Sequence, residues 1–208
     1  MSVFSSMIRL HGHSMVSIGD FLVIDPHDGG SIGLPRPAIR RTEYVFMTHD
    51  HYDHNAFQII QSKEKRTGFT GIFSSSGYSI QGIRVNHDGN GGKSRGKTSI
   101  YTVKIGNLSF VHMGDIGEYP RESLIKDLAA DILALPVGGV ITIDGKEASQ
   151  LVKEISPSVV IPMHYWVKGH LMPLDPPDEF LNLTGLQVYL ENEIDENNLK
   201  KGIYLYKP

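Results

Sequence analysis

The most constraining feature of this chain is a run of seven residues, Thr48-His49-Asp50-His51-Tyr52-Asp53-His54, directly after the apolar stretch Tyr44–Met47. Five of the seven side chains can ligate a metal ion. His49 and His51 are two residues apart, so in an extended segment they project to one side and can share an ion. Asp53 and His54 can then turn toward a second ion. A surface loop that collected histidines by chance is the weaker interpretation, because this density of imidazoles and carboxylates far exceeds ordinary usage. The run therefore predicts a metal site.

Composition narrows the class of protein and of partner. The 208 residues predict a single domain spanning residues 1–208, which would bury roughly 70% of its unfolded surface. A net charge of -3 does not favour a nucleic acid as the main partner, so a small-molecule substrate is expected. The chain has no cysteine, which excludes disulfides and thiolate ligands and leaves only histidine and carboxylate for a metal. We expect a cytoplasmic protein, since residues 1–7 lack the pattern of a secretory signal and no run reaches the ~18 apolar residues of a membrane helix. Nothing in the sequence indicates the oligomeric state.

Short apolar stretches separated by turn signals predict many strands and few helices. The strands are expected over residues 7–10, 15–18, 21–24, 44–47, 71–73, 80–85, 99–105, 108–111, 132–135, 159–161, 186–190 and 202–206. Helices are expected over 55–65, 120–130, 145–155 and after Pro176-Pro177. The helix over 145–155 has the best marked start, because Asp144 can accept the amide of Glu147 while the Glu147 side chain reaches back. Strands with interspersed helices and no linker favour an α/β fold of sheet layers flanked by helices.

The remaining candidate ligands each lie just past a strand-like stretch, where a packed scaffold can project a polar group into a cleft. They are His87, His112, Asp115 and His164. Two metals ~3.5–4 Å apart need about three ligands each and a bridge, and these residues supply that number. A buried structural histidine is the competing interpretation for each. It is strongest for His112, which precedes Asp115 by only three residues, so the choice between His87 and His112 stays open.

With these residues in place, the chain resembles the metallo-β-lactamase fold family. The resemblance depends on Thr-His-x-His-x-Asp-His at residues 48–54, with Asp25 before it and His87, Gly114-Asp115 and His164 after it. It implies a four-layer αββα sandwich of two mixed sheets flanked by helices, with metals at one edge. It places His49, His51 and His87 on a first metal, Asp53, His54 and His164 on a second, and Asp115 between them.

A narrower resemblance is carried by Gly12-His13-Ser14 and by residues 112–115, 135–139 and 161–165. These segments are similar to the branch that includes L-ascorbate-6-phosphate lactonase. Members of this branch are described as manganese or zinc enzymes, so the motif alone does not give the identity of the metal. From the number of ligands we expect two divalent ions, zinc first, with manganese or iron open. The absence of cysteine departs from the β-lactamases that use a cysteine ligand, and β-lactam hydrolysis is not expected.

The expected chemistry is hydrolysis by a metal-bound hydroxide, since a metal lowers the pKa of bound water from about 15.7 to about 7. The substrate would be a lactone or a phosphate-bearing small molecule. Asp53 would orient the hydroxide and pass a proton to the leaving group, a role that similar family members give this position. Asp25 would accept a hydrogen bond from a ligand imidazole, although a turn aspartate before proline explains it too. His13 would contact substrate or stabilise an oxyanion, and a structural role for it is equally open.

A second tier of residues flanks the expected cleft. Lys93 and Arg95, with Lys97, could form a pocket for a phosphate group, or they could belong to a solvated basic loop. Trp166, Lys168 and His170 follow His164 and could reach substrate, although a tryptophan is more often a packing residue.

Four alternatives compete with a hydrolase that acts on a small lactone or a phosphate-bearing molecule. Residues 91–98 match a nucleotide-binding P-loop, but the alternating stretch 99–105 that follows predicts a strand and not the required helix. A phosphodiesterase of the same fold, a di-iron redox protein and a non-catalytic metal-binding protein remain as further alternatives.

Overall fold

The smaller of two sheets is built mostly from the N-terminal quarter of the chain, in the order β13-β1-β2-β3-β4-β5. Its strands are β1 (Ile8–Leu10), β2 (Val16–Ile18), β3 (Leu22–Ile24), β4 (Tyr44–Met47), β5 (Glu64–Thr67) and β13 (Glu193–Ile194). The first three form the predicted antiparallel meander, and β3, β4 and β5 run parallel. This computed structural model describes residues 7–208. Residues 1–6, which carry most of the expectation about a secretory signal, lie outside the described part.

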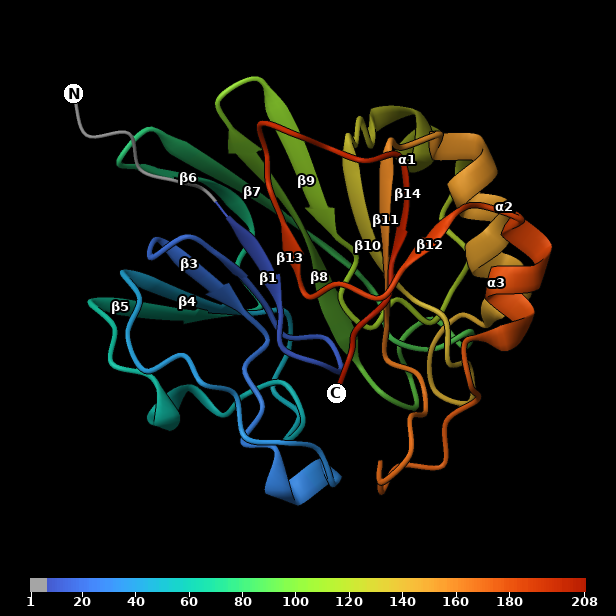
Figure 1. The fold of residues 1–208 in the computed structure, drawn as a ribbon, viewed down its shortest axis with the longest axis horizontal. Helices are drawn as coiled ribbons and strands as arrows, with labels where there is room; N and C mark the ends of the chain where they lie inside the picture. Colours follow the sequence, from blue (N-terminus) through green and yellow to red (C-terminus); the bar gives the residue numbers. More distant parts are fainter. Residues whose placement is uncertain (1–6) are drawn as a thin grey trace.

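The larger sheet has the order β12-β14-β11-β10-β9-β8-β7-β6 and faces the smaller one (Figure 1). Its strands are β6 (Gly71–Ser75), β7 (Tyr78–Asn86), β8 (Lys97–Ile105), β9 (Leu108–His112), β10 (Ile132–Pro136), β11 (Val159–Met163), β12 (Val188–Tyr189) and β14 (Gly202–Tyr204). The strands from β6 to β9 are antiparallel, and those from β9 to β12 across the sheet are parallel. The predicted fold class, two mixed sheets flanked by helices, is confirmed.

Three α-helices cover the outer face of the larger sheet: α1 (Glu122–Asp127), α2 (Gly145–Ile155) and α3 (Asp178–Thr184). Helix α2 has the predicted bounds, and both capping hydrogen bonds form: the amide of Glu147 donates to Asp144, and the amide of Asp144 donates to Glu147. Helix α1 is shorter than the predicted 120–130. Short 3-10 helices lie at Gly30–Ile32 and Phe57–Ile59. No helix of residues 7–208 combines the length and apolar character needed to cross a membrane.

The predicted helix over residues 55–65 is wrong. The chain forms only a 3-10 turn at Phe57–Ile59, and residues 64–67 then pair with β4 as the edge strand β5. Ile60 is buried, and Phe57 and Ile59 pack with it against apolar side chains of the smaller sheet. The free backbone edge of β4 therefore determines the conformation of residues 64–67, because pairing with a sheet overrides a local helical pattern. Strand β13 was not predicted, and it exists only because the edge of β1 is available to it.

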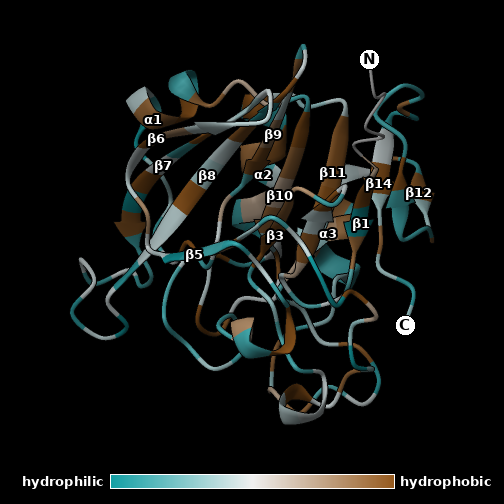
Figure 2. Cartoon of the chain, turned by 90° about the vertical axis from the view of Figure 1, so that its left-hand side faces the viewer, coloured by the Kyte–Doolittle hydropathy of each residue, from teal (hydrophilic) through white to brown (hydrophobic). Residues whose placement is uncertain are grey.

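The main core lies between the sheets and includes the fully buried rings of Phe46, Tyr101 and Phe110. The hydroxyl of Tyr101 on β8 donates to the carbonyl of Met47 at the end of β4, at 2.7 Å, which ties the two sheets together. All five residues of β10 and of β11 are buried, as expected for strands covered on both faces. Figure 2 shows the hydrophobic residues concentrated on the strands, whereas the loops at one end are largely hydrophilic.

This loop-bearing end is where the strands deliver the candidate ligands. In the smaller sheet, β1, β3 and β4 run in one direction and lead into His13, Asp25 and residues 48–54. In the larger sheet, β7, β9 and β11 share one direction and lead into His87, Asp115 and His164. Strand direction thus collects side chains that are far apart in the sequence.

Candidate metal centre

One carboxylate oxygen lies at the centre of the collected side chains. Oδ2 of Asp115 is 3.0 Å from Nε2 of His54 and 3.1 Å from Nε2 of His164. It is also 3.3 Å from Nε2 of His87 and 3.5 Å from Nε2 of His49. A single oxygen so placed can be shared by ions bound on either side of it.

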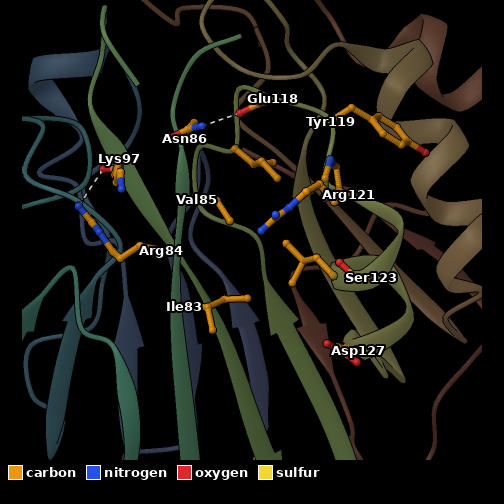
Figure 3. Close-up of a pocket in the computed structure, with 13 residues that line it drawn as sticks. Ile83, Arg84, Val85, Asn86, Lys97, Glu118, Tyr119, Arg121, Ser123 and Asp127 are labelled. Atoms are coloured by element: carbon orange, nitrogen blue, oxygen red, sulfur yellow. Dashed lines mark hydrogen bonds between the residues drawn. The ribbon is translucent and has the colours of Figure 1, made fainter. Parts of the chain in front are cut away.

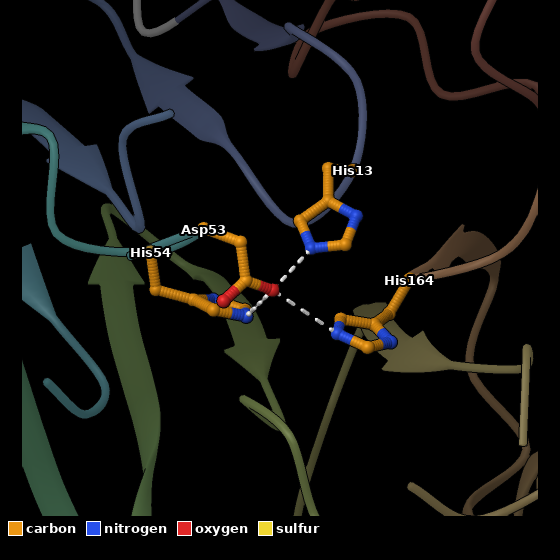
Figure 4. Close-up of side chains that lie close together, drawn as sticks. All are labelled: His13, Asp53, His54 and His164. Carbon is orange, nitrogen blue, oxygen red and sulfur yellow. Dashed lines mark hydrogen bonds and ion pairs between the residues drawn. The ribbon is translucent and has the colours of Figure 1, made fainter. Parts of the chain in front are cut away.

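Besides a set in which Asp25 lies close to His49 and His54, the other candidate ligands form two groups around this oxygen. In the first group, His49, His51 and His87 have ligating atoms within 4.8 Å of one another. In the second, the ligating atoms of His13, Asp53, His54 and His164 meet the same limit, and Figure 4 shows His54, His164 and His13 directed at Asp53. The structure therefore brings together all seven predicted ligands, and it adds His13 to the second group.

The donor atoms fit divalent metal ions. Several buried nitrogen and oxygen atoms of the cluster have no hydrogen-bond partner among residues 7–208: Nε2 of His49 and His54, both ring nitrogens of His87 and His164, and Oδ1 of Asp115. Asp25, Asp53 and Asp115 are also buried, and buried carboxylates need nearby positive charge. Unpaired imidazole nitrogens beside buried carboxylates form a suitable donor set for zinc, manganese or iron.

The same carboxylates set the protonation of the histidines. Burial opposes a charge on His164, but the field of Asp115 more than offsets it and raises the pKa of His164 to about 9. His54 is also buried, and Asp115, Asp53 and Asp25 raise its pKa well above the ordinary value. Burial would raise the pKa of Asp115, yet the charges of His164 and His54 hold it well below its usual range. The site therefore attracts positive charge, as protons or as metal ions.

Asp25 holds the second group of ligands in place. Its Oδ2 accepts hydrogen bonds from Nδ1 of His54 at 2.9 Å and from the hydroxyl of Thr48 at 2.6 Å, while its Oδ1 accepts the amide of Thr48 at 2.6 Å. Because Asp25 holds the proton on Nδ1 of His54, Nε2, which faces Asp115, is the nitrogen that gives up its proton when a metal binds, so Asp25 fixes the ring in the orientation that can bind a metal.

Thr48 and Thr98 hold the ring of His49 through hydrogen bonds to its Nδ1. The sequence analysis did not predict this role for either threonine. Because Thr48 donates its hydroxyl proton to Asp25, its oxygen accepts from Nδ1 of His49, at 2.9 Å. The hydroxyl of Thr98 lies 3.3 Å from the same nitrogen and accepts the amide of Asp115 at 3.2 Å. The first position of the seven-residue run pointed to Thr48, whereas no sequence signal pointed to Thr98.

Three residues of the cluster adopt backbone conformations that are uncommon for non-glycine residues. His13, Asp25 and His164 have φ angles of 53°, 50° and 52°, in the left-handed region. Such conformations persist where surrounding contacts over-determine them, and they cluster at functional sites. Each of these residues directly or closely follows a strand, so the strained turn aims its side chain into the cluster.

Comparison with known proteins assigns the family. A family model described as a beta-lactamase superfamily domain matches residues 8–164. Relatives named UPF0173 metal-dependent hydrolase come from Staphylothermus marinus, 35% identical over 165 residues (70% of this chain, 71% of the relative), and from Symbiobacterium thermophilum, 31% identical over 188 residues (76% and 83%). The chain belongs to this family of metal-dependent hydrolases. A similar fold is found in a Thermotoga maritima protein described as a Zn-dependent hydrolase of the metallo-beta-lactamase superfamily, with a TM-score of 0.78, 24% identity and coverage of 96% of this chain and 97% of that one.

His112 does not face the metal centre as the ligands do. Its Nδ1 accepts the amide of Gly114 at 3.1 Å, so its proton is on Nε2, which donates to the carbonyl of Ser14 at 2.8 Å. Both ring nitrogens are therefore occupied, whereas both nitrogens of His87 lack a hydrogen bond among the described residues. This geometry favours His87 as the third histidine of the first group.

The glycine-rich loop of the hydrolase is organised by Asp88. Its carboxylate accepts the backbone amides of Asn90, Gly92, Ser94 and Arg95 at 2.7–3.0 Å. Three of these amides, those of Gly92, Ser94 and Arg95, are within the P-loop match and would have to face a phosphate, and strand β8 begins at Lys97 where that motif needs a helix. The nucleotide-binding alternative is therefore excluded, and the loop can meet an anion with the exposed side chains of Lys93, Arg95 and Lys97.

The segment after His164 returns to the cluster through His170. Trp166 is 41% exposed, and its indole nitrogen donates to the carbonyl of His170 at 3.2 Å. Lys168 is exposed at the tip of this segment. His170 is buried, and its Nε2 lies 3.1 Å from Nδ1 of His13.

A separate hollow of about 540 Å³ lies between β7 and α1 (Figure 3). Asn86 and Ile116, neighbours of His87 and Asp115 in the sequence, belong to its lining. Asn86 donates to Glu118 at 2.6 Å, and Arg121 extends into the hollow. None of the candidate ligands lines this hollow, so it is distinct from the metal centre.

Proposed function

We propose that this metal-dependent hydrolase is binuclear. His49, His51 and His87 would hold one ion, and Asp53, His54 and His164 the other, with Asp115 shared. The observation that carries the proposal is the position of Oδ2 of Asp115, within 3.0–3.5 Å of Nε2 of His49, His54, His87 and His164. An oxygen that bound only one ion would need to face the histidines of one group only, whereas this oxygen faces histidines of both groups.

Zinc is the first candidate metal, with manganese and iron as the others. Bound there, divalent ions would make a water molecule acidic enough to attack at neutral pH and would stabilise charge on the leaving group. The side chains around them hold positions and protons. Asp25 and Thr48 hold Nδ1 of His54 and of His49 in hydrogen bonds and so leave Nε2 of each ring for a metal, and Oδ2 of Asp53 accepts a hydrogen bond from Nε2 of His13 at 2.7 Å. Asp53 would orient the water and carry its proton to the leaving group.

The expected substrate is a small lactone or a phosphate-bearing small molecule, in line with the resemblance to the L-ascorbate-6-phosphate lactonase branch. Support comes from the way the cluster reaches solvent. His51 is the one partly exposed member of the two described groups, and the exposed Tyr52 follows it. The ring centroids of His51 and His87 are 5.1 Å apart, and the loop bearing Lys93 and Arg95 begins directly after His87. A substrate entering beside His51 would meet these cations, with Trp166 and Lys168 as weaker candidates.

We propose that the enzyme is cytoplasmic and acts on a diffusible substrate. A net charge of -3 is unfavourable for a nucleic-acid partner, and we propose no membrane partner. A phosphodiesterase is the second candidate, because it would use the same ligands and the same cationic loop. A di-iron redox protein or a non-catalytic metal-binding protein would also use these ligands, and the experiment below separates them.

The test combines metal analysis with a hydrolase screen. Purified protein loaded with zinc, manganese or iron should bind two ions per chain and hydrolyse a member of a panel of lactones, phosphodiesters and thioesters. Replacing Lys93 and Arg95 together by alanine should raise KM for phosphorylated substrates, with replacement of the exposed Lys104 as the matched control. One ion per chain would refute the binuclear assignment. Two ions without hydrolysis of any ester would favour a binding or redox role.

A further inference from the structure

The turn between β1 and β2, residues 11–14, is held by three histidines from remote parts of the chain. In each of them, Nδ1 accepts the backbone amide of the residue two positions later: Gly29 for His27, Gly114 for His112 and Met172 for His170, at 3.0–3.1 Å. An Nδ1 that accepts carries no proton, so each neutral ring has its proton on Nε2. The three Nε2 groups then donate to the carbonyl of His11, the carbonyl of Ser14 and Nδ1 of His13, at 2.9, 2.8 and 3.1 Å.

Two of these bonds end on the backbone, and the third ends on a ring. Because Nδ1 of His13 accepts from His170, the proton of the neutral His13 ring is on Nε2. That proton is donated to Oδ2 of Asp53, at 2.7 Å. A chain of hydrogen bonds therefore runs in one direction from the amide of Met172 through His170 and His13 to Asp53.

The turn itself is strained in a way that requires such support. Gly12 and His13 have φ angles of 89° and 53°, and a Cβ at Gly12 would meet the ring of Tyr206 at 2.9 Å. The amide of His164 also donates to the carbonyl of His13, at 3.2 Å. Asp53 and His170 thus hold the His13 ring, and the amide of His164 holds its backbone carbonyl, which is the pattern expected where a side chain must be held accurately.

We propose that His170 is a positioning residue that holds His13 as a hydrogen-bond donor to Asp53, and that His13 is not a metal ligand. Position alone would allow His13 to be a metal ligand, since Nε2 of His13 lies within 4.8 Å of the ligating atoms of Asp53, His54 and His164. A ligand role needs a bare Nε2, which moves the proton to Nδ1, against the proton on Nε2 of His170. Relieving that clash would move the proton of His170 to its Nδ1, where the amide of Met172 already points. The hydrogen-bond chain therefore selects the donor role.

The consequence concerns Asp53. A hydrogen bond from His13 to Oδ2 sets the orientation of the carboxylate that faces His54 and His164, at 3.0 and 3.4 Å. This consequence rests on the proposed metal centre, whereas the proton positions exist in the metal-free protein. The two proposals can therefore fail separately.

Nitrogen-15 NMR of the histidine rings tests the proton positions directly. In the metal-free wild type and after zinc addition, His13 should show a protonated Nε2 and a bare Nδ1. In D53A the remaining ring partner is His170, so the same form of His13 should persist, and in the double variant D53A/H170A both forms should appear. A zinc-coordinated Nε2 of His13, or a proton on its Nδ1 in D53A, would overturn the proposal.

Zinc affinity provides the second readout. H170A should weaken zinc binding about tenfold, the lower end of the range for loss of an outer hydrogen-bond partner, and H170Q, which keeps a donor near Nε2, should restore it to within about threefold. The matched control is H27A, which removes an equivalent bond to the same turn but none to the His13 ring. Equal losses in H27A and H170A would contradict a specific role for His170. If the wild type binds no zinc, the proposed function fails while the NMR result still decides the role of His170.

Discussion

Replacing Asp25 by asparagine should disable a ligand without removing it. Asp25 accepts three hydrogen bonds, from the amide and hydroxyl of Thr48 and from Nδ1 of His54. An asparagine oxygen can keep the bond to the Thr48 amide, but its NH2 group would then face two donors at the Oδ2 position. His54 can relieve the conflict only by moving its proton to Nε2, the atom that faces Asp115.

The magnitude follows from the two lost bonds. Hydrogen bonds to a charged group contribute about 1.5–3 kcal/mol each, so we expect the free energy of unfolding to fall by on the order of 3 kcal/mol, the lower end of the sum. Loss of an outer partner of a metal ligand costs about 10–100-fold in metal affinity. Zinc affinity of the second group should therefore drop by that factor in D25N, although every proposed ligand is still present.

The assay is zinc competition with a chromophoric chelator, together with chemical unfolding of the metal-free protein. The matched control is D28N, three residues along the same loop, where the carboxylate of Asp28 accepts bonds only from the exposed Ser31. D28N should bind zinc as the wild type does. Wild-type zinc affinity in D25N, within about threefold, would refute the argument that Asp25 sets the tautomer of His54.

The remaining predictions concern the metal centre as a whole. D115N should weaken both sites by more than the about 10–100-fold of an outer partner, and loss at one site only would argue against a shared oxygen. Removing metal with a chelator should lower the Tm by about 5–10 °C, from ~2.7 kcal/mol of binding at a hundredfold excess over Kd, and an unchanged Tm would contradict specific binding. Zinc binding at neutral pH should release protons, because the raised pKa values of His54 and His164 keep both rings protonated without metal. Zinc affinity should therefore increase as the pH rises toward about 9. Calorimetry in two buffers with different protonation enthalpies measures the proton release, and zinc binding without proton release would contradict this prediction. G114A should impair metal binding, since a Cβ there would meet Thr98 Oγ1 at 2.5 Å. G71A is the control: a Cβ at residue 71 would have no atom within 4 Å, so the substitution should lower stability only through the positive φ angle and leave zinc affinity intact.

Much of the fold could be predicted because the strands are marked locally. Apolar stretches bounded by turn residues located the meander, the long hairpin of β8 and β9, and the buried strands β10 and β11. The start of α2 was equally local, since its capping box involves residues three positions apart. The predicted helix over 55–65 failed because the outcome depended on a partner strand, β4, whose open edge is not visible in the segment itself.

For the site as well, local sequence predicted some features and the packing of distant segments decided the others. The sequence by itself determined which side chains could bind a metal, because imidazoles and carboxylates directly after strands are a local property. Only the tertiary structure decided which of them meet. His87 directly follows a strand and His112 ends one, yet among residues 7–208 neither ring nitrogen of His87 has a hydrogen bond, whereas His112 donates to the carbonyl of Ser14. Likewise, nothing local indicates that His170 bonds to His13, 157 residues away. Strand direction and proton position are properties of the packed chain, since a hydrogen bond needs both partners, and folding alone brings them together.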